Sequence, residues 1–346
     1  MIKEAIQIVV EGRSLSMDEA SQVMEELMDG LVTPSQFGAL VTALRIKGET
    51  VEEIAGLART MRAKALKVNS SGPVVDTCGT GGDGASTFNV STTAAFIAAG
   101  AGLKVAKHGN RAMSSKSGSA DVLEELGVRI ELSPEQVERC LKDVNIGFMF
   151  APAFHPSMKY ASAPRREIGI RTVFNILGPL TNPAGAEAQV IGVPSEQFGS
   201  RIAEALGLLG TKRAVIVYGL SGLDEITVTD RTRIWELANG RVADYLVSPE
   251  EFGYARATLK DIQGGSAAEN AQILRSILSG EKGPRRDMAV MNAAAAIKAG
   301  KGNGSGSSGV AESLVECAKK AEQAIDSGKA LDRLEKLIEL TQSFGG

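Results

Sequence analysis

The sequence predicts an α/β fold, in which a small N-terminal helical domain precedes a larger α/β/α domain with a mostly parallel central sheet. Two observations predict it. Three helix-start patterns of the Ser/Thr-x-x-Glu/Gln type occur before residue 66. After residue 72, short apolar runs alternate with helical segments, as in sheets whose parallel strands are joined by helices. We therefore expect domains at residues 1–66 and 72–346.

The helical domain shows where its helices start. Its three capping boxes begin at Ser16, Thr33 and Thr50. The second also has proline at the first helical position, where the missing N–H costs nothing. Apolar residues at helical spacing indicate the buried face of one helix, namely Val23, Leu27 and Leu31.

The larger domain is expected to alternate strands and helices. Strands are predicted at residues 73–75, 103–106, 190–193 and 214–218, and helices at 93–100 and after Ser133. Asn239-Gly240, between apolar runs, predicts a two-residue hairpin and so one antiparallel ribbon. The glycine- and serine-rich segment 302–309 is expected to be a flexible loop. The last helix, at residues 330–344, is amphipathic and should pack on the sheet.

Composition excludes several classes of protein. The net charge of −3 provides no basic field that would attract nucleic acid. No apolar run reaches the ~18 residues of a membrane span, and we expect neither a signal peptide nor a membrane partner. The scattered cysteines fit reduced thiols in a cytoplasmic protein rather than disulfides or a zinc motif; they are Cys78, Cys140 and Cys317. Cys78 has no evident base beside it and is interpreted as a space-filler.

The most informative segment is the glycine-rich run from Asp76 to Asp83. It follows a short strand and has three glycines in four positions, residues 79–82. Glycines at that density let several backbone N–H groups point at one anion, which suits a phosphate or pyrophosphate. The carboxylate of Asp83 suits a sugar hydroxyl or a metal-bound water. An ordinary turn is the alternative for this run taken alone.

Two more segments favour an anion. Asn89, Ser91 and Thr92 lie at the predicted start of a helix, where unpaired N–H groups attract negative charge. The alternative is that one hydroxyl only caps the helix. Lys107 follows a strand and leads into residues 111–119, which are rich in cations and hydroxyls and suit a mobile phosphate-binding loop. The alternative there is a solvated, disordered loop.

Adjacent carboxylates at Asp224 and Glu225 follow a strand and a glycine-containing turn. Neighbouring negative charges repel each other, and hard oxygen ligands suit Mg²⁺, which usually shares its shell with substrate phosphates. Two ordinary surface acids are the alternative, and only the phosphate-binding segments make the metal interpretation the better one.

In order and spacing, these motifs resemble the anthranilate phosphoribosyltransferase family of pentosyltransferases, which act in tryptophan biosynthesis and belong to the nucleoside phosphorylase-like class. The resemblance rests on residues 79–83, 89–92, 107–111, 115–121 and 224–225, and it continues through 151–158, 165–169 and 175–183. It spans nearly the whole chain. The family usually has a shorter, less glycine-rich turn in place of residues 302–309.

The resemblance implies transfer of phosphoribosyl from 5-phosphoribosyl 1-pyrophosphate to the amine of anthranilate, without a protein nucleophile. It implies that the donor is bound by Gly79, Gly82, Asp83, Thr87, Asn89, Val90, Ser91, Thr92, Lys107, His108, Gly109, Asn110, Arg111, Ala112, Met113, Ser114, Ser115 and Ser119. Two Mg²⁺ ions would be held by Ser91, Asp224 and Glu225. Anthranilate would be bound by Gly79, Asn110 and Arg165, the arginine holding the carboxylate.

The resemblance also implies that helices from about residues 165–185 join the N-terminal domain and that this domain forms a homodimer contact. His108 is interpreted as lining the channel of the aromatic substrate or orienting its amine, with a structural role as the alternative. His155, which precedes a proline, is interpreted as structural.

Two other functions remain open on the sequence. A pyrimidine nucleoside phosphorylase shares the fold and the glycine loop, but the carboxylate pair and Arg165 argue against it. A non-enzymatic, nucleic-acid-binding relative would need a basic groove, which the net negative charge disfavours.

Overall fold

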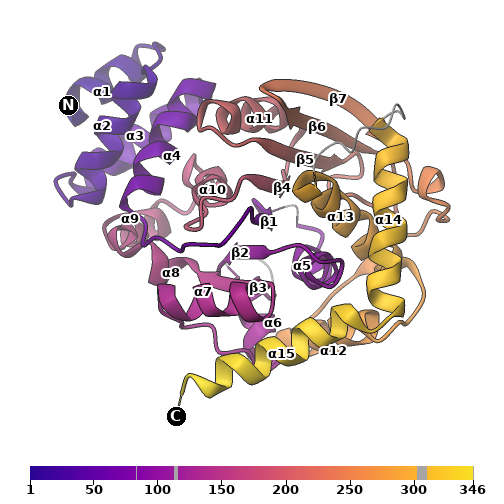
Figure 1. Ribbon diagram of the computed structural model, residues 1–346. Coiled ribbons are helices and arrows are strands. Elements are labelled where there is room, and N and C mark those ends of the chain that lie inside the picture. Colours follow the sequence, from indigo (N-terminus) through magenta and orange to yellow (C-terminus); the bar gives the residue numbers. More distant parts are fainter. Residues whose placement is uncertain (83, 113–115, 302–309, 346) are drawn as a thin grey trace.

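The computed structural model describes residues 1–82, 84–112, 116–301 and 310–345. It consists of a small helical domain and a larger α/β domain (Figure 1). The helices of the small domain are α1 (Ile2–Val10), α2 (Met17–Met28), α3 (Pro34–Lys47) and α4 (Val51–Lys64). Within the described residues, none of the helices combines the length and the apolar character that a membrane crossing requires.

All three capping boxes of the helical domain form as predicted. The side chains of Ser16, Thr33 and Thr50 each accept the backbone N–H three residues later. One detail of the prediction is wrong, because Leu31 does not belong to the buried face of α2. That helix ends at Met28, Gly30 follows with φ +76°, and Leu31 is 70% exposed.

The sheet has seven strands in the order β3-β2-β1-β4-β5-β6-β7. The first five strands in this order are parallel, and the last two pairs, β5/β6 and β6/β7, are antiparallel, as the sequence predicts. Asn239 and Gly240 form the hairpin turn, both with positive φ. The strands are β1 (Val75–Gly79), β2 (Val105–Gly109), β3 (Ile146–Phe150), β4 (Ala188–Gly192), β5 (Arg213–Gly219), β6 (Thr232–Ala238) and β7 (Arg241–Val247).

Buried side chains alternate between the two faces of the sheet. In β5, Val215 belongs to one apolar cluster and Ile216 to the other, as the period of two requires. Helices α5 (Val90–Gly100) and α13 (Pro284–Lys301) cover the first face, and α11 (Gly199–Leu208) covers the second. The remaining helices of the α/β domain, with short 3-10 helices marked η, are α6 (Ser119–Glu125), α7 (Pro134–Asp143), α8 (Ala151–Phe154), η1 (Pro156–Met158), η3 (Glu196–Phe198), η4 (Pro249–Phe252), η5 (Leu259–Ile262), α12 (Ala267–Leu278), α14 (Val310–Asp326) and α15 (Lys329–Ser343).

The expectation that the last helix packs on the sheet is mostly wrong. Helix α15 lies chiefly against α5, with further contacts to α7, α12 and α14, and its main contact with the sheet is with the edge strand β3. Helix α15 thus lies mainly beside other helices rather than across the strands (Figure 1).

The chain returns to the helical domain between β3 and β4. Helices α9 (Lys159–Ile168), α10 (Phe174–Leu177) and η2 (Gly178–Thr181) lie beside α2, α3 and α4. The ring of Phe174 lies 5.3 Å from that of Phe37. Arg62 of α4 donates to the carbonyl oxygen of Leu180 at 2.6 Å and to that of Leu209 at 3.2 Å. One buried cluster thus runs from the helical domain to the α11 face of the sheet.

Strand β1 lies where the strand order reverses, since β2 and β3 follow on one side and β4 and β5 on the other. In sheets of this kind, ligands bind at the carboxyl ends of the strands beside such a reversal. The glycine run starts at the carboxyl end of β1. Lys107 lies within β2, two residues before its end, and not after the strand as predicted.

Candidate active site

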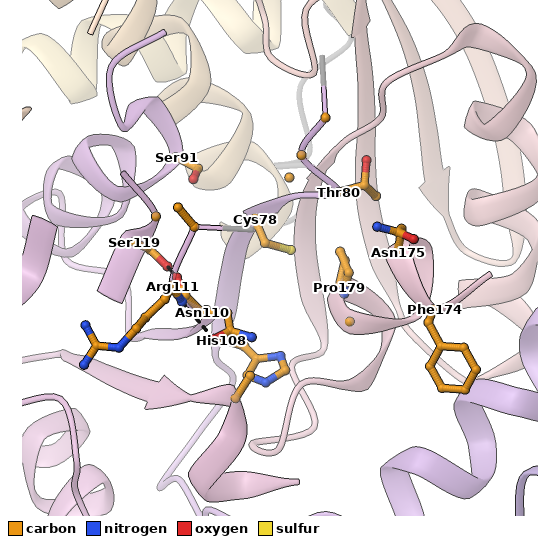
Figure 2. A pocket seen from close by; sticks show the side chains of 18 of the residues that line it. Cys78, Thr80, Ser91, His108, Asn110, Arg111, Ser119, Phe174, Asn175 and Pro179 are labelled. Carbon is orange, nitrogen blue, oxygen red and sulfur yellow. Dashed lines mark hydrogen bonds between the residues drawn. The ribbon is translucent and has the colours of Figure 1, made fainter. Parts of the chain in front are cut away.

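One pocket of about 750 Å³ lies at the carboxyl ends of β1 and β2 and is bordered by α9, α10 and η2. Every described residue that the sequence suggested for the site lines it. Residues 83 and 113–115, which include Asp83, Met113, Ser114 and Ser115, lie outside the described residues. Figure 2 shows Ser91, Ser119, Asn110 and His108 on one side of the pocket, and Thr80, Asn175 and Pro179 on the other.

The glycine run turns tightly and contacts a carboxylate. Gly81 and Gly82 have φ of +63° and +84°, which glycine adopts without strain. The N–H of Gly81 donates to Oδ2 of Asp224 at 2.9 Å. A Cβ at Gly79 would lie only 2.6 Å from the same oxygen, so a glycine is required there for the carboxylate to approach. The loop and Asp224 therefore form one wall.

The start of α5 opens into the pocket. The helix begins at Val90, and Asn89 occupies the N-cap position without making the side-chain capping bond. Ser91 and Thr92 lie inside the first turn, so the interpretation of either as the cap is wrong. Oγ of Ser91 lies 3.3 Å from Nζ of Lys107, and buried Oγ1 of Thr92 has no hydrogen bond to the described residues. Hydroxyls and backbone N–H groups are thus available to an anion.

Lys107 is a buried cation on the pocket floor. Its ammonium donates to the carbonyl oxygen of Thr77 and to Oγ of Ser91. Burial lowers the pKa of Lys107, and the nearby carboxylate of Asp76 opposes that shift. A buried ammonium whose hydrogen-bond acceptors are an uncharged carbonyl oxygen and a hydroxyl is well prepared to bind a phosphate.

The donor set for Mg²⁺ is present. Asp224 is buried and Glu225 half-buried, and both line the pocket together with Ser91. Burial raises the pKa of the Cys78 thiol, and both carboxylates add to that effect. Within the described residues, no group of three His, Cys, Asp or Glu side chains could hold an ion by itself. The set fits Mg²⁺, which completes its shell with water and substrate phosphate.

Arg165 comes from α9 on the opposite side. Its guanidinium lies over the ring of Phe174, 5.3 Å from the centroid, and burial lowers its pKa. No ion pair joins it to Glu167 or to another carboxylate in the part of the chain that the structure describes, so the interpretation of a surface ion pair is not supported. A half-buried guanidinium without a counter-ion can bind a carboxylate.

The two histidines lie together. The rings of His108 and His155 are 5.0 Å apart, and burial lowers their pKa values to about 3 and about 4. Both imidazoles are therefore neutral at physiological pH. Nε2 of His108 makes no hydrogen bond to the described residues. A neutral ring there can contact an aromatic substrate without competing for its carboxylate.

Arg111 differs from the other residues of the phosphate-binding set. Its guanidinium forms ion pairs with Asp121 and Glu124 and lies 5.5 Å from the ring centroid of Phe150. In Figure 2 it points away from the labelled side chains around the pocket. Only part of Arg111 thus lines the pocket.

Several lining residues had no role in the sequence interpretation. They are Lys159, Arg166, Arg171 and Asn175. Arg171 lies near the glycine run, and its Nη2 is 3.5 Å from the carbonyl oxygen of Thr80. The cations near Arg165 were a signal in the sequence, but only folding shows that α9 faces the pocket.

The family models of known proteins match both parts of the chain. Residues 3–65 match the helical bundle domain of the glycosyl transferase family, and residues 71–331 match its a/b domain. Two relatives named anthranilate phosphoribosyltransferase come from Dehalococcoides mccartyi and Chloroflexus aggregans. The first is 53% identical, with 99% of each chain covered. The second is 56% identical, with 99% of this chain and 98% of the relative covered.

Solved structures agree. The crystal structure of anthranilate phosphoribosyltransferase from Thermus thermophilus is 42% identical with a TM-score of 0.91, covering 98% of this chain and 99% of that one. The enzyme from Saccharomyces cerevisiae in complex with PRPP and Mg is 30% identical with a TM-score of 0.89, and the match covers 99% of this chain and 98% of that one. Identity of this level over nearly the whole length shows common descent, and the chain belongs to the anthranilate phosphoribosyltransferase family.

Proposed function

We propose that this protein transfers the phosphoribosyl group of 5-phosphoribosyl 1-pyrophosphate to the amine of anthranilate, releasing pyrophosphate. This is the second step of tryptophan biosynthesis from chorismate. The observation that carries the proposal is a single pocket with two chemically different ends. The glycine run, the α5 N-terminus and Lys107 form an end suited to phosphates. Arg165, beside Phe174, forms an end suited to a carboxylate, and the neutral ring of His108 can contact an aromatic substrate in the same pocket.

The reaction breaks the bond between the anomeric carbon and the pyrophosphate oxygen. The pyrophosphate leaves with the electron pair, the ribose gains oxocarbenium character, and the amine nitrogen then forms the new bond and loses a proton. The main task is to stabilise the negative charge of the leaving group. Lys107 and the N–H groups at the α5 N-terminus do so with fixed positive charge and dipoles.

Ser91, Asp224 and Glu225 would hold Mg²⁺, two ions per subunit, and the metal would supply further positive charge for the pyrophosphate. The yeast relative solved in complex with PRPP and Mg supports magnesium as the metal. Asp224 is held by Gly81, so its carboxylate is in place before the donor binds. The other residues of the donor set would bind the donor as the resemblance implies.

At the other end, Arg165 would hold the anthranilate carboxylate through two parallel hydrogen bonds. Because the amine is ortho to that carboxylate, one clamp fixes both the place and the direction of attack. Asn110 and Gly79 also line the pocket and complete the proposed acceptor site. A solved yeast relative in complex with 4-fluoroanthranilate supports an anthranilate-like acceptor substrate.

Domain limits at residues 1–66 and 72–346, a homodimer through the helical domain and a cytoplasmic location complete the proposal. The helical domain leaves large apolar side chains in solvent, which supports a subunit contact; they are Val10 (66% exposed), Leu31 (70%) and Ile46 (81%). Sedimentation of the wild-type protein tests the dimer, and a monomer at micromolar concentration would contradict it.

The deciding experiment follows the fluorescence of anthranilate in the presence of the donor and Mg²⁺. Fluorescence should fall as the amine is phosphoribosylated, and pyrophosphate should appear in equal amount. Thymidine with phosphate in a parallel reaction tests the phosphorylase alternative, and a gel shift over a salt series tests nucleic-acid binding. Unchanged fluorescence with folded protein, or phosphorolysis of thymidine, would overturn the proposal.

A further inference from the structure

The regular backbone pairing of strands β1 and β2 stops before the pocket, although the strands remain neighbours. The parallel ladders β1/β4 and β2/β3 each have five residue pairs in register. The ladder β1/β2 has one, Val75 with Val105, at the end far from the pocket. Backbone groups that a regular sheet pairs with each other must therefore find other partners, because they are buried.

Side chains occupy the gap between these strands. Oδ1 of Asp76 accepts the backbone N–H of His108 at 3.2 Å, and Oδ2 accepts Nδ2 of Asn182 at 2.7 Å. The same Nδ2 donates to the carbonyl oxygen of Ala106 at 2.8 Å. On β1, the carbonyl oxygen of Thr77 accepts from the ammonium of Lys107. The carboxylate of Asp76, the amide of Asn182 and the ammonium of Lys107 thus replace backbone hydrogen bonds of the β1/β2 ladder.

This replacement is costly for the fold. Asp76 is fully buried, and Lys107 and Asn182 are nearly so. Burial raises the pKa of Asp76 to about 6, although Lys107 and three hydrogen-bond donors favour its charged form. A sheet with a regular ladder and apolar side chains would avoid these desolvation costs. The arrangement therefore needs a reason other than stability.

Its effect is on the pocket. Lys107 and His108 are consecutive, and both line the pocket. Asp76 binds the backbone between them and, through its charge, favours the ammonium of Lys107. Asn182 fixes Asp76 from the turn after η2, and its own Oδ1 is held by the N–H of Ala184 at 2.9 Å. Asp76 thus links three segments beside the pocket, namely β1, β2 and the turn after η2.

We propose that Asp76 is a positioning residue for the phosphoribosyl donor: with Asn182 it bridges β1 and β2 and so fixes Lys107 at the pocket floor. The inference rests on the proposed function, because the donor is the ligand that Lys107 would bind. Asp76 itself is fully buried and is not among the residues that line the pocket, so it acts through Lys107.

The test measures donor binding by calorimetry in the presence of Mg²⁺. In Asp76→Asn, Oδ1 still accepts from His108, but the new amide faces the amide of Asn182 and the charge is lost. We expect the Kd for the donor to rise at least about tenfold. In a Lys107→Met background the same substitution should change the Kd less than about twofold, since Lys107 carries the effect.

Two further variants complete the design. Asn182→Ala keeps the carboxylate of Asp76 but removes the amide that hydrogen-bonds it, and should weaken donor binding about three- to tenfold. This variant replaces Asp76→Asn in the test if Asp76→Asn does not fold. Glu53→Gln is the matched control, because Glu53 is also fully buried, accepts backbone N–H groups and pairs with Lys47, yet lies outside the pocket. It should lower Tm and leave donor binding unchanged.

The outcomes are distinguishable from those of the proposed function. A wild-type protein that neither binds the donor nor consumes anthranilate contradicts the proposed function. A wild-type protein that does both, combined with unchanged donor binding in Asp76→Asn and Asn182→Ala, overturns the inference. Additive effects of Asp76→Asn and Lys107→Met would overturn it as well, because Asp76 would then not act through Lys107.

Discussion

The guanidinium of Arg171 occupies the space where a side chain at Gly82 would begin. A Cβ built on Gly82 would lie 1.5 Å from Nη1 of Arg171. The glycine run thus serves two purposes at this position, a positive φ and room for a cation beside the loop. Arg171 lines the pocket, so its displacement would change the charge that faces a bound anion.

Gly82→Ala should therefore impair donor binding. The alanine is strained at φ +84° and pushes the flexible end of Arg171 away. We expect KM for the donor to rise about tenfold, measured by anthranilate fluorescence. Gly84→Ala is the control, because Gly84 also has positive φ, +72°, but nothing lies within 4 Å of its Cβ position. Equal effects of the two substitutions would show that strain, and not Arg171, is responsible.

Activity should require Mg²⁺ and Asp224. Chelator should abolish turnover and added Mg²⁺ restore it, because the pyrophosphate leaves with a charge that the metal balances. Asp224→Asn keeps the size and the contact with Gly81 but loses the charge, and should lower kcat at least about a hundredfold with little change in Tm. Asp230→Asn, an acid nearby in the sequence that pairs with Arg256, should have wild-type kinetics. Full activity in metal-free buffer would contradict this prediction.

Lys107→Ala should reduce kcat/KM for the donor about ten- to hundredfold, the equivalent of a charge-assisted contact of ~1.5–3 kcal/mol. Steady-state kinetics with varied donor provide the measurement. Lys104→Ala is a matched control, because Lys104 precedes the same strand but its ammonium bonds Ser71 outside the pocket. If both variants behave alike, Lys107 has no specific contact with the donor.

Arg165→Ala should raise KM for anthranilate at least about tenfold, which corresponds to ~1.4 kcal/mol. Calorimetric binding of the donor with Mg²⁺ should barely change, since Arg165 comes from the other side of the pocket. Arg59→Ala removes only a surface pair with Asp18 and serves as the control. Equal weakening of both substrates, or of neither, would show that Arg165 has another role.

The two buried histidines should make the fold sensitive to acid. Their pKa values are lowered to about 3 and about 4, whereas the unfolded chain binds protons below about 6.5. Between these values the unfolded state binds more protons, so the free energy of unfolding falls as the pH falls, by ~2 kcal/mol per histidine from pH 6.5 to pH 5. Asp76, whose pKa is raised to about 6, opposes this trend within the same range, because its folded form takes up a proton first.

Urea unfolding at pH 7 and pH 5 checks this balance. Between pH 7 and pH 5, the free energy of unfolding of His155→Gln should fall by ~2 kcal/mol less than that of the wild-type protein, whatever the stability of the variant at pH 7. An identical pH dependence in both proteins would contradict the burial of a neutral His155.

The features predicted correctly from the sequence are those set by neighbours along the chain. The box at Ser16 and the turn at Asn239-Gly240 depend on a few residues and form as expected. Leu31 shows the limit of the same reasoning, since periodicity continues past Met28 but the helix does not. Glycine-rich and cationic segments at strand ends pointed to one pocket because parallel strands present their carboxyl ends at one edge.

What the sequence could not show depends on contacts between distant segments. Asp76 and Asn182 are 106 residues apart, and their bond exists only because the β1/β2 ladder opens. Arg171 reaches Thr80 across 91 residues. Likewise, α15 packs on α5 beside α13 and α14, which contact the same helix, and no local pattern records this arrangement.

The buried cluster that continues from the helical domain into α9, α10 and α11 limits how this molecule can be taken apart. A fragment that lacks the helical domain and begins at residue 72 would expose Phe174 and Leu177, which α3 and α4 help to bury. It would also leave the carbonyl oxygen of Leu180 without its donor, Arg62. The N-terminal bundle is therefore not a removable module, although its fold looks separate. In evolution, too, insertions or exchanges at this junction would have to preserve both sides together, so the two segments are expected to be inherited as one unit.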